Sequence, residues 1–135
     1  MNYTSSLNEI SEDMLSGGFF VGWPNPPSAT THLKLLRNSY RSVVAIDKEN
    51  NQVVGFINAV SDGVLSAYIP LLEVLPAYQN KGIGKRLVES LLEELNHLYM
   101  IDLLCDEDLQ KYYSKIGMQK AQGMMIRNYN NQSGS

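Results

Sequence analysis

The chain has 135 residues, a mass of 15.1 kDa and a net charge of −3. This length fits one domain whose core is large enough to fold without a structural metal or disulfides. Hydrophobic residues make up 44% and charged residues 19%, which excludes a disordered chain, and the single cysteine excludes a disulfide framework. The pI of about 5.3 argues against a nucleic-acid-binding protein.

The N-terminal residues lack the basic start and apolar run of a secretory signal, and no apolar run is long enough to span a membrane. With one thiol and no export signal, we expect a cytoplasmic protein that does not insert into a membrane. We expect residues 1–130 to form a single domain and residues 131–135 to form a polar tail.

The first third of the chain predicts a short strand and two helices. Residues 2–7 read as a strand, and a helix capped by Asn8 or Ser11 ends at two glycines. Residues 19–27 are aromatic and rich in proline, which indicates an ordered loop. A second helix is expected from Ser28 to Asn38.

In the middle of the chain, the sequence pattern becomes typical of β-strands. Residues 41–47 and 52–60 are rich in β-branched side chains and flank a polar turn, which predicts an antiparallel hairpin. Residues 64–75 form a third apolar run that contains Pro70. Proline removes a ladder hydrogen bond, so this strand must carry a bulge or lie at an edge.

The last part of the chain alternates between helix and strand patterns. Leucines recur at spacings of three and four through residues 84–98, which predicts an amphipathic helix. A strand over 99–105 and a helix over 106–117 follow, and residues 118–121 and 123–129 read as two closing strands. The order β-α-α-β-β-β-α-β-α-β-β predicts an α/β (α+β) domain, a mixed sheet with helices on its faces.

Residues 79–84, Gln-Asn-Lys-Gly-Ile-Gly, lie where the third apolar strand ends and the leucine-rich helix begins. The free N–H groups of a helix's first turn bind anions, and glycines let a ligand approach the backbone. Lys81 and Lys85 add positive charge in an acidic chain. The spacing fits neither a P-loop nor a dinucleotide-binding fingerprint, so the segment predicts another kind of phosphate or pyrophosphate site.

This segment resembles the acyl-CoA-binding loop of the GNAT N-acetyltransferase family, whose pattern is Arg/Gln-x-x-Gly-x-Gly/Ala. A second match lies at residues 106–118, where the family often has Asn-x-x-Ala-x-x-Leu-Tyr-x-x-x-Gly-Phe. Tyr113 and Gly117 fall on the tyrosine and glycine of that pattern, although Asp106 replaces its asparagine. The resemblance covers roughly residues 2–129 and implies a single-domain acyl-CoA N-acyltransferase fold.

The resemblance implies direct transfer of the acetyl group from acetyl-CoA to a primary amine of a small molecule or peptide, with no acyl-enzyme and no metal. Tyr113 would protonate the leaving thiolate as the general acid. Phe20 and Trp23, in the proline-rich loop, would line the acceptor side. The residues expected to bind acetyl-CoA are Val74, Leu75, Gln79, Asn80, Lys81, Gly82, Ile83, Gly84 and Lys85.

Several roles stay open on the sequence alone. Glu73 is the only acid in its apolar strand and suits a base for the substrate ammonium, but strand alternation could equally point it at solvent. His32 and His97 are expected at the helix surface, and Cys105 is expected to be buried and inert. The alternative function is a non-catalytic acyl-CoA sensor on the same fold. The oligomeric state is open, because the closing strands could pair across a homodimer.

Overall fold

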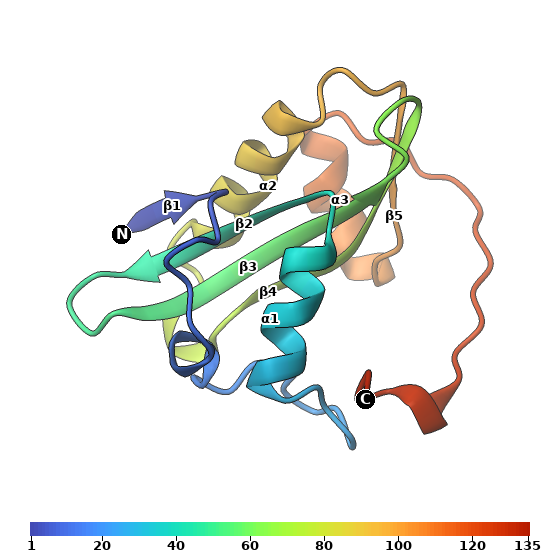
Figure 1. The fold of residues 1–135 in the computed structure, drawn as a ribbon. Helices are drawn as coiled ribbons and strands as arrows, with labels where there is room; N and C mark the ends of the chain where they lie inside the picture. Colours follow the sequence, from blue (N-terminus) through green and yellow to red (C-terminus); the bar gives the residue numbers. More distant parts are fainter.

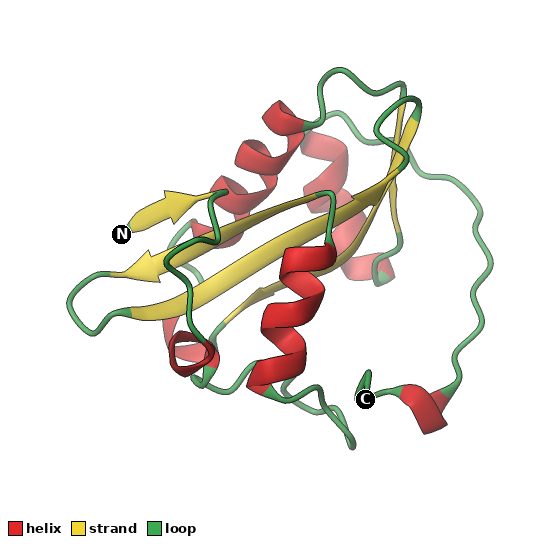
Figure 2. Ribbon diagram, in the orientation of Figure 1, coloured by secondary structure: helices red, strands yellow, loops and turns green.

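Five strands form one sheet in the order β1-β2-β3-β4-β5, with helices on both faces (Figures 1 and 2). The computed structural model describes all residues from 1 to 135. Neighbouring strands are antiparallel except β4 and β5, which run parallel. The strands are β1 (Asn2–Thr4), β2 (Arg41–Asp47), β3 (Gln52–Ser61), β4 (Ser66–Val74) and β5 (Met100–Leu103).

The helices separate into two layers. The front layer in Figure 1 holds α1 (Ala29–Asn38) and the 3₁₀ turn η1 (Glu12–Leu15). The layer behind the sheet holds α2 (Ile83–Glu94) and α3 (Glu107–Lys115). Two further 3₁₀ turns are η2 (Pro76–Tyr78) and η3 (Tyr129–Asn131). None of the helices combines the length and the hydrophobicity of a membrane-spanning segment.

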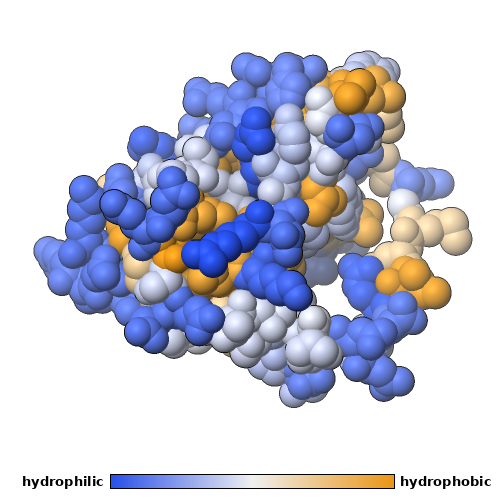
Figure 3. All heavy atoms as spheres, in the orientation of Figure 1, coloured by the Kyte–Doolittle hydropathy of each residue, from blue (hydrophilic) through white to orange (hydrophobic).

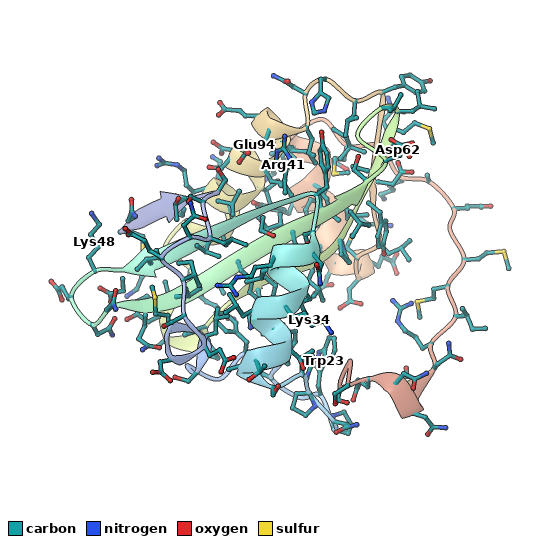
Figure 4. The ribbon with its side chains drawn as sticks, in the orientation of Figure 1. Trp23, Lys34, Arg41, Lys48, Asp62 and Glu94 are labelled. Carbon is teal, nitrogen blue, oxygen red and sulfur yellow. The ribbon has the colours of Figure 1, made fainter.

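Sequence patterns account for most of these elements. Ser28 caps α1, because its side chain accepts a hydrogen bond of 3.1 Å from the backbone N–H of Thr31. On α2, the leucines Leu87 and Leu91 are fully buried against the sheet. Arg41, at the start of β2, pairs with Glu94 at the end of α2 at 3.5 Å (Figure 4). The mixed sheet expected from the sequence is confirmed, because β4 pairs antiparallel with β3 and parallel with β5.

Pro70 lies at a β-bulge. Asn58 of β3 pairs with Leu71 and Val60 pairs with Tyr68, so Ala59 faces two residues of β4, Ile69 and Pro70. A bulge accommodates a proline, since the residue there makes no ladder hydrogen bond. The bulge coincides with the end of β5, whose last pair is Ile69 with Leu103. Beyond it, residues 70–74 of β4 have no neighbour on that side.

Three sequence-based expectations were wrong. The helix expected before residue 17 is a single 3₁₀ turn, and the helix expected over 84–98 ends at Glu94. The closing strands over 118–121 and 123–129 do not form in this chain, although the composition is that of strands. A strand needs an edge to pair with, and residues 119–130 are exposed and make no backbone hydrogen bond to β5.

Candidate functional site

The unpaired edge of β4 presents backbone groups that can bind a ligand. The backbone N–H of Leu75 donates to the carbonyl of Val54 at 2.8 Å, and Val74 pairs with Gly55. This identifies Gly55–Val74 as a non-hydrogen-bonded pair, so the N–H and C=O of Val74 point away from β3. The two-residue period gives Leu72 the same orientation. The groups of both residues therefore face the side that β5 leaves open.

The residues after β4 bring residues 79–84, the segment predicted to bind phosphate, to this edge. The side-chain amide of Gln79 donates a hydrogen bond of 3.0 Å to the carbonyl of Val74. The Tyr78 hydroxyl donates to Asp47 at 2.6 Å and ties the same turn to the end of β2. Residues predicted to act together, Val74 and Gln79, are therefore in contact. Because Gln79 occupies one acceptor position of the Val74 carbonyl, the Val74 N–H is the freer group for a ligand.

The first turn of α2 has the geometry of an anion site. Asn80 and Gly82 adopt left-handed conformations, with φ of 63° and 82°, and Gly82 is the N-cap. The first helical hydrogen bond runs from Arg86 N–H to the Gly82 carbonyl, so the N–H groups of Ile83, Gly84 and Lys85 have no helical partner. A Cβ at Gly82 would meet no atom within 4 Å, so the backbone is open to a ligand.

The charged side chains around this turn differ in their availability. Lys81 lies 5.6 Å from the Tyr78 ring and is exposed. Lys85 is also exposed, with a loose pair to Glu89 at 3.9 Å that contributes little stability. Arg86 instead stacks over the ring of Tyr3 at 4.8 Å, on β1. Lys81 and Lys85 are therefore the exposed cations of this turn that are not stacked on β1.

Two predicted ligand-binding residues contribute only their backbone. The side chains of Leu75 and Ile83 are 8% and 4% exposed and belong to the core. A Cβ at Gly84 would lie 3.8 Å from a Val74 methyl group, so helix and strand are in ordinary contact there. The backbone of this strand–helix junction is thus fixed by packing before any ligand arrives.

Tyr113 lies on α3, on the same side of the sheet as α2. Its side chain is 9% exposed, and its ring packs edge-on against Tyr112 at 5.1 Å. Burial, with smaller contributions from Cys105 and Tyr112, raises the pKa of Tyr113 above its ordinary value, which keeps the phenol protonated. The hydroxyl of Tyr112 is enclosed and unpartnered, whereas that of Tyr113 is not among the enclosed atoms.

Glu73 points to the opposite face of β4 from Val74, toward the loop before α1. Its Oε1 accepts a hydrogen bond of 2.8 Å from the backbone N–H of Phe20, and its Oε2 makes none to the protein. Burial raises the pKa of Glu73, and the bond from Phe20 opposes the shift. Glu73 therefore anchors the loop with one oxygen and has the other free for a proton. It makes no hydrogen bond to Tyr113.

The loop over residues 19–27 is built on an aromatic cluster. The Phe20 ring is 4% exposed and lies 5.0 Å from the rings of both Trp23 and His32. Trp23 is half-buried and lies on the loop below α1 (Figure 4). If this loop lines the acceptor site, the Trp23 side chain could contact the acceptor. The buried Phe20 ring could only support the loop from within the core.

His32 corrects a sequence-based expectation. It was expected at the helix surface, but it is 1% exposed, and its ring lies 4.4 Å from that of Phe56. Burial lowers its pKa to about 4, so the imidazole is neutral near neutral pH. Its Nε2 has no protein partner. The signal that could have located it is its place four residues before Leu36, on the apolar stripe of α1.

Comparison with known proteins agrees with this geometry. The model of the GNAT acetyltransferase family matches residues 8–118. The chain belongs to the GNAT acetyltransferase family. A solved structure from Deinococcus radiodurans R1, assigned as an acetyltransferase, is 41% identical and superposes with a TM-score of 0.93 over 98% of this chain and 91% of that chain.

Two plant GNAT relatives are similar over shorter stretches. The chloroplastic GCN5-related N-acetyltransferase 3 of Arabidopsis thaliana is 37% identical over 61% of this chain, and the histone acetyltransferase TAP1 of Glycine max is 32% identical over 73%. The chain spans 35% and 47% of the lengths of these two proteins. Residues 8–118, which the family model matches, include the β4 edge, the first turn of α2 and Tyr113.

Proposed function

We propose that this GNAT domain transfers the acetyl group of acetyl-CoA directly to a primary amine of a small molecule or peptide. The observation that carries the proposal is the meeting of the open β4 edge with the free first turn of α2. The N–H of Val74 would bind the pantetheine chain in the manner of an added strand. Residues 80–85 would bind the pyrophosphate through their N–H groups, with Lys81 and Lys85 adding charge.

Starting from an ammonium group, the chemistry removes two protons from the nitrogen and delivers one proton to the thiolate. Oε2 of Glu73 takes a proton from the ammonium group, directly or through water. The amine nitrogen then forms a bond to the thioester carbonyl carbon, and the bond from that carbon to sulfur breaks. The Tyr113 hydroxyl donates a proton to the leaving thiolate, and the acylated nitrogen loses its second proton to solvent. Exchange with water then returns Tyr113 to its protonated form and Glu73 to its carboxylate. The raised pKa values of both side chains suit these roles.

The two side chains approach the gap in the sheet from opposite faces. Glu73 lies on the α1 face, with the loop that carries Trp23, and Tyr113 lies on the α2 and α3 face. An acceptor amine would therefore enter beside Trp23, and CoA would lie along β4. The carboxylate of Glu73 favours a cationic acceptor. The name of the Glycine max relative supports including peptide lysines among the acceptors.

Calorimetry with acetyl-CoA, followed by an acceptor screen, tests the proposal. Polyamines, amino sugars, and peptides with a free lysine or N-terminus are incubated with acetyl-CoA, and the acetylated product is measured by mass. Product mass is preferred to thiol detection because Cys105 is a free thiol. Binding together with turnover of any amine supports transfer. Binding without turnover over the whole panel would support the acyl-CoA sensor instead.

A further inference from the structure

Strand register places Glu73 on the face of the sheet that carries α1. Phe56 of β3 packs against His32 of α1, with ring centroids 4.4 Å apart, and Phe56 pairs with Glu73. Side chains alternate along a strand, so Val60, four residues after Phe56, faces the same side. Val60 is 46% exposed, which shows that α1 leaves it uncovered. The α1 face of the sheet is therefore open beyond the helix.

The open part of the α1 face carries a second carboxylate. Tyr68 of β4 pairs with Val60, and Asp102 of β5 pairs with Tyr68, so all three side chains face this side. Asp102 is exposed and takes part in neither of the two ion pairs that the chain forms. In Figure 1, no helix lies in front of β5, and Figure 3 shows apolar and weakly polar side chains to the right of α1. Asp102 is thus available to a cationic ligand.

Glu73 and Asp102 stand at the two ends of one row of side chains. Phe56 and Val60 mark their levels on β3, and four residues of strand span about 14 Å, with one strand spacing of about 4.8 Å from β4 to β5. Leu71 lies between the two levels, because it pairs with Asn58. A ligand that reaches both carboxylates must therefore be linear and lie along the sheet.

The surface between the two carboxylates favours positive charge. The strands β3, β4 and β5 contain no lysine or arginine. Asn58 is 3% exposed, and its Nδ2 donates to Oγ of Ser39 at 3.0 Å, while its Oδ1 has no partner. An unpaired carbonyl oxygen adds negative potential to its surroundings without touching a ligand. The half-buried ring of Tyr68 can hold a cation over its face.

We propose that Asp102 binds the second cationic group of a linear polyamine whose terminal amine is acetylated beside Glu73. The inference rests on the proposed acetyl transfer and names the class of its acceptor. The methylene chain would lie over Leu71 and Tyr68, and the far ammonium group would pair with Asp102. Because Asp102 does not touch the reacting atoms, it determines specificity and acts on KM rather than on kcat.

An acid on a short edge strand also has a purely structural role, because a charge there discourages the addition of another strand. That role would leave the choice of acceptor unchanged. Dependence of KM on the length and charge of the acceptor therefore separates the two roles of Asp102.

Steady-state kinetics with a chain-length series tests the proposal. The acceptors are spermine, terminal diamines of four to twelve carbons, and primary monoamines of the same lengths. In the parent, KM should be lowest for spermine and for diamines of about ten carbons, which when extended span the separation of the two carboxylates. Asp102→Asn should raise KM for these acceptors about tenfold and leave KM for the monoamines within about twofold.

Two further variants control for the loss of a charge. Glu93→Gln removes an exposed acid from α2, on the other face of the sheet, and should behave as the parent. Asp102→Glu keeps the charge and should keep the preference for long diamines. Far-ultraviolet circular dichroism checks that all variants are folded.

Calorimetric binding of the ten-carbon diamine to the parent and to Asp102→Asn gives a measurement that needs no turnover. Equal KM values of the parent for monoamines and diamines, or an unchanged KM for the ten-carbon diamine in Asp102→Asn, overturn this inference and leave the proposed transfer standing. If no amine is acetylated, the proposed transfer fails, and calorimetry still decides the role of Asp102. Binding about tenfold weaker to Asp102→Asn supports the site, and equal binding overturns it.

Discussion

The backbone N–H of Phe20 donates a hydrogen bond of 2.8 Å to Oε1 of Glu73, across 53 positions of the sequence. Phe20 has a φ of 65°, a conformation that non-glycine residues rarely adopt. The carboxylate therefore helps fix a strained loop residue while its second oxygen makes no bond to the protein. A single side chain connects the position of the loop over residues 19–27 to the proposed proton transfer.

Substitution of Glu73 by glutamine and by alanine separates these two roles. Glutamine keeps an oxygen acceptor for Phe20 but cannot take a proton, so we expect a folded protein with kcat/KM reduced roughly a hundredfold. Because burial raises the pKa of Glu73, its charge is disfavoured in the folded state, and stability is lost as pH rises through that pKa. Thermal unfolding at neutral pH should therefore show Glu73→Gln no less stable than the parent.

Glu73→Ala, by contrast, leaves the Phe20 N–H without its partner, which costs about 1–3 kcal/mol of unfolding free energy. The pH dependence of kcat/KM should show an acid limb above the ordinary carboxyl range in the parent and none in Glu73→Gln. If the limb persists in Glu73→Gln, the proton acceptor is another group and Glu73 serves only the loop.

Acetyl-CoA binding is best tested at Gly84. Gly82 has a φ of 82°, so any side chain there strains the backbone, whereas Gly84 has ordinary helical geometry and room for a Cβ. Gly84→Asp places a carboxylate beside the pyrophosphate site. Calorimetry should show affinity at least tenfold weaker, about 1.4 kcal/mol. An acid in the first helical turn favours the helix dipole, so folding should not suffer.

Gly84→Ala is the control for added bulk without charge, and it should retain affinity within about threefold, well under 1 kcal/mol. Equal affinities of the parent and Gly84→Asp for acetyl-CoA would place the pyrophosphate elsewhere.

The sequence predicted the parts of this fold whose determinants are local. Ser28 begins α1 as a cap, Pro70 marks the bulge, and the leucine period locates α2. Pairing and burial are decided by distant residues. The segment 123–129 has strand composition but finds no edge in its own chain, and His32 is enclosed by rings from the loop and β3. Because histidine is polar, His32 was expected at the surface. Its spacing of four residues from Leu36 instead places it on the buried face of α1.

The same contrast between local and distant determinants holds for the candidate site. The spacing to Gly117, whose φ of 98° ends α3, selected Tyr113 over its neighbour. Burial does not repeat that choice, because Tyr113 is the more buried residue, whereas the Tyr112 hydroxyl is the one enclosed without a partner. The hydrogen bond between Glu73 and Phe20 could not be predicted, because no sequence pattern connects a strand to a loop 53 residues earlier. Strand alternation left the direction of the Glu73 side chain open, and the register of β4 against β3 resolves it.

Tyr113→Phe removes only a hydroxyl, so the fold and the affinity for acetyl-CoA should survive. We expect kcat to fall near the low end of the roughly hundredfold to ten-thousandfold range of general acid catalysis, because a thiolate is already a fair leaving group. KM for acetyl-CoA should change little, since the hydroxyl acts mainly in the transition state. Steady-state kinetics with the best acceptor measures both constants.

Tyr112→Phe is the matched control. Its hydroxyl is enclosed and has no partner, so removing it should leave kcat unchanged and stabilise the fold by up to about 1 kcal/mol. A loss of kcat in Tyr112→Phe alone would move the acid to Tyr112. Unchanged kcat in both variants would leave the thiolate to be protonated by water.

His32 makes the stability of the fold depend on pH. Its pKa is about 4 in the folded protein against 6.5 when free, so the unfolded chain binds a proton more readily. The contribution of the neutral ring to stability is therefore complete above pH 6.5 and decreases as pH falls toward 4, by up to about 3 kcal/mol. Denaturant unfolding of the parent at a series of pH values should show this decline.

His32→Leu should be less sensitive to pH over the same window, whatever its absolute stability. His97→Gln, which alters an exposed histidine bonded to Tyr40, controls for general loss of a histidine. Parallel pH curves for the parent and His32→Leu would show that the buried ring accepts a proton in the folded state, and that the aromatic cluster opens to water.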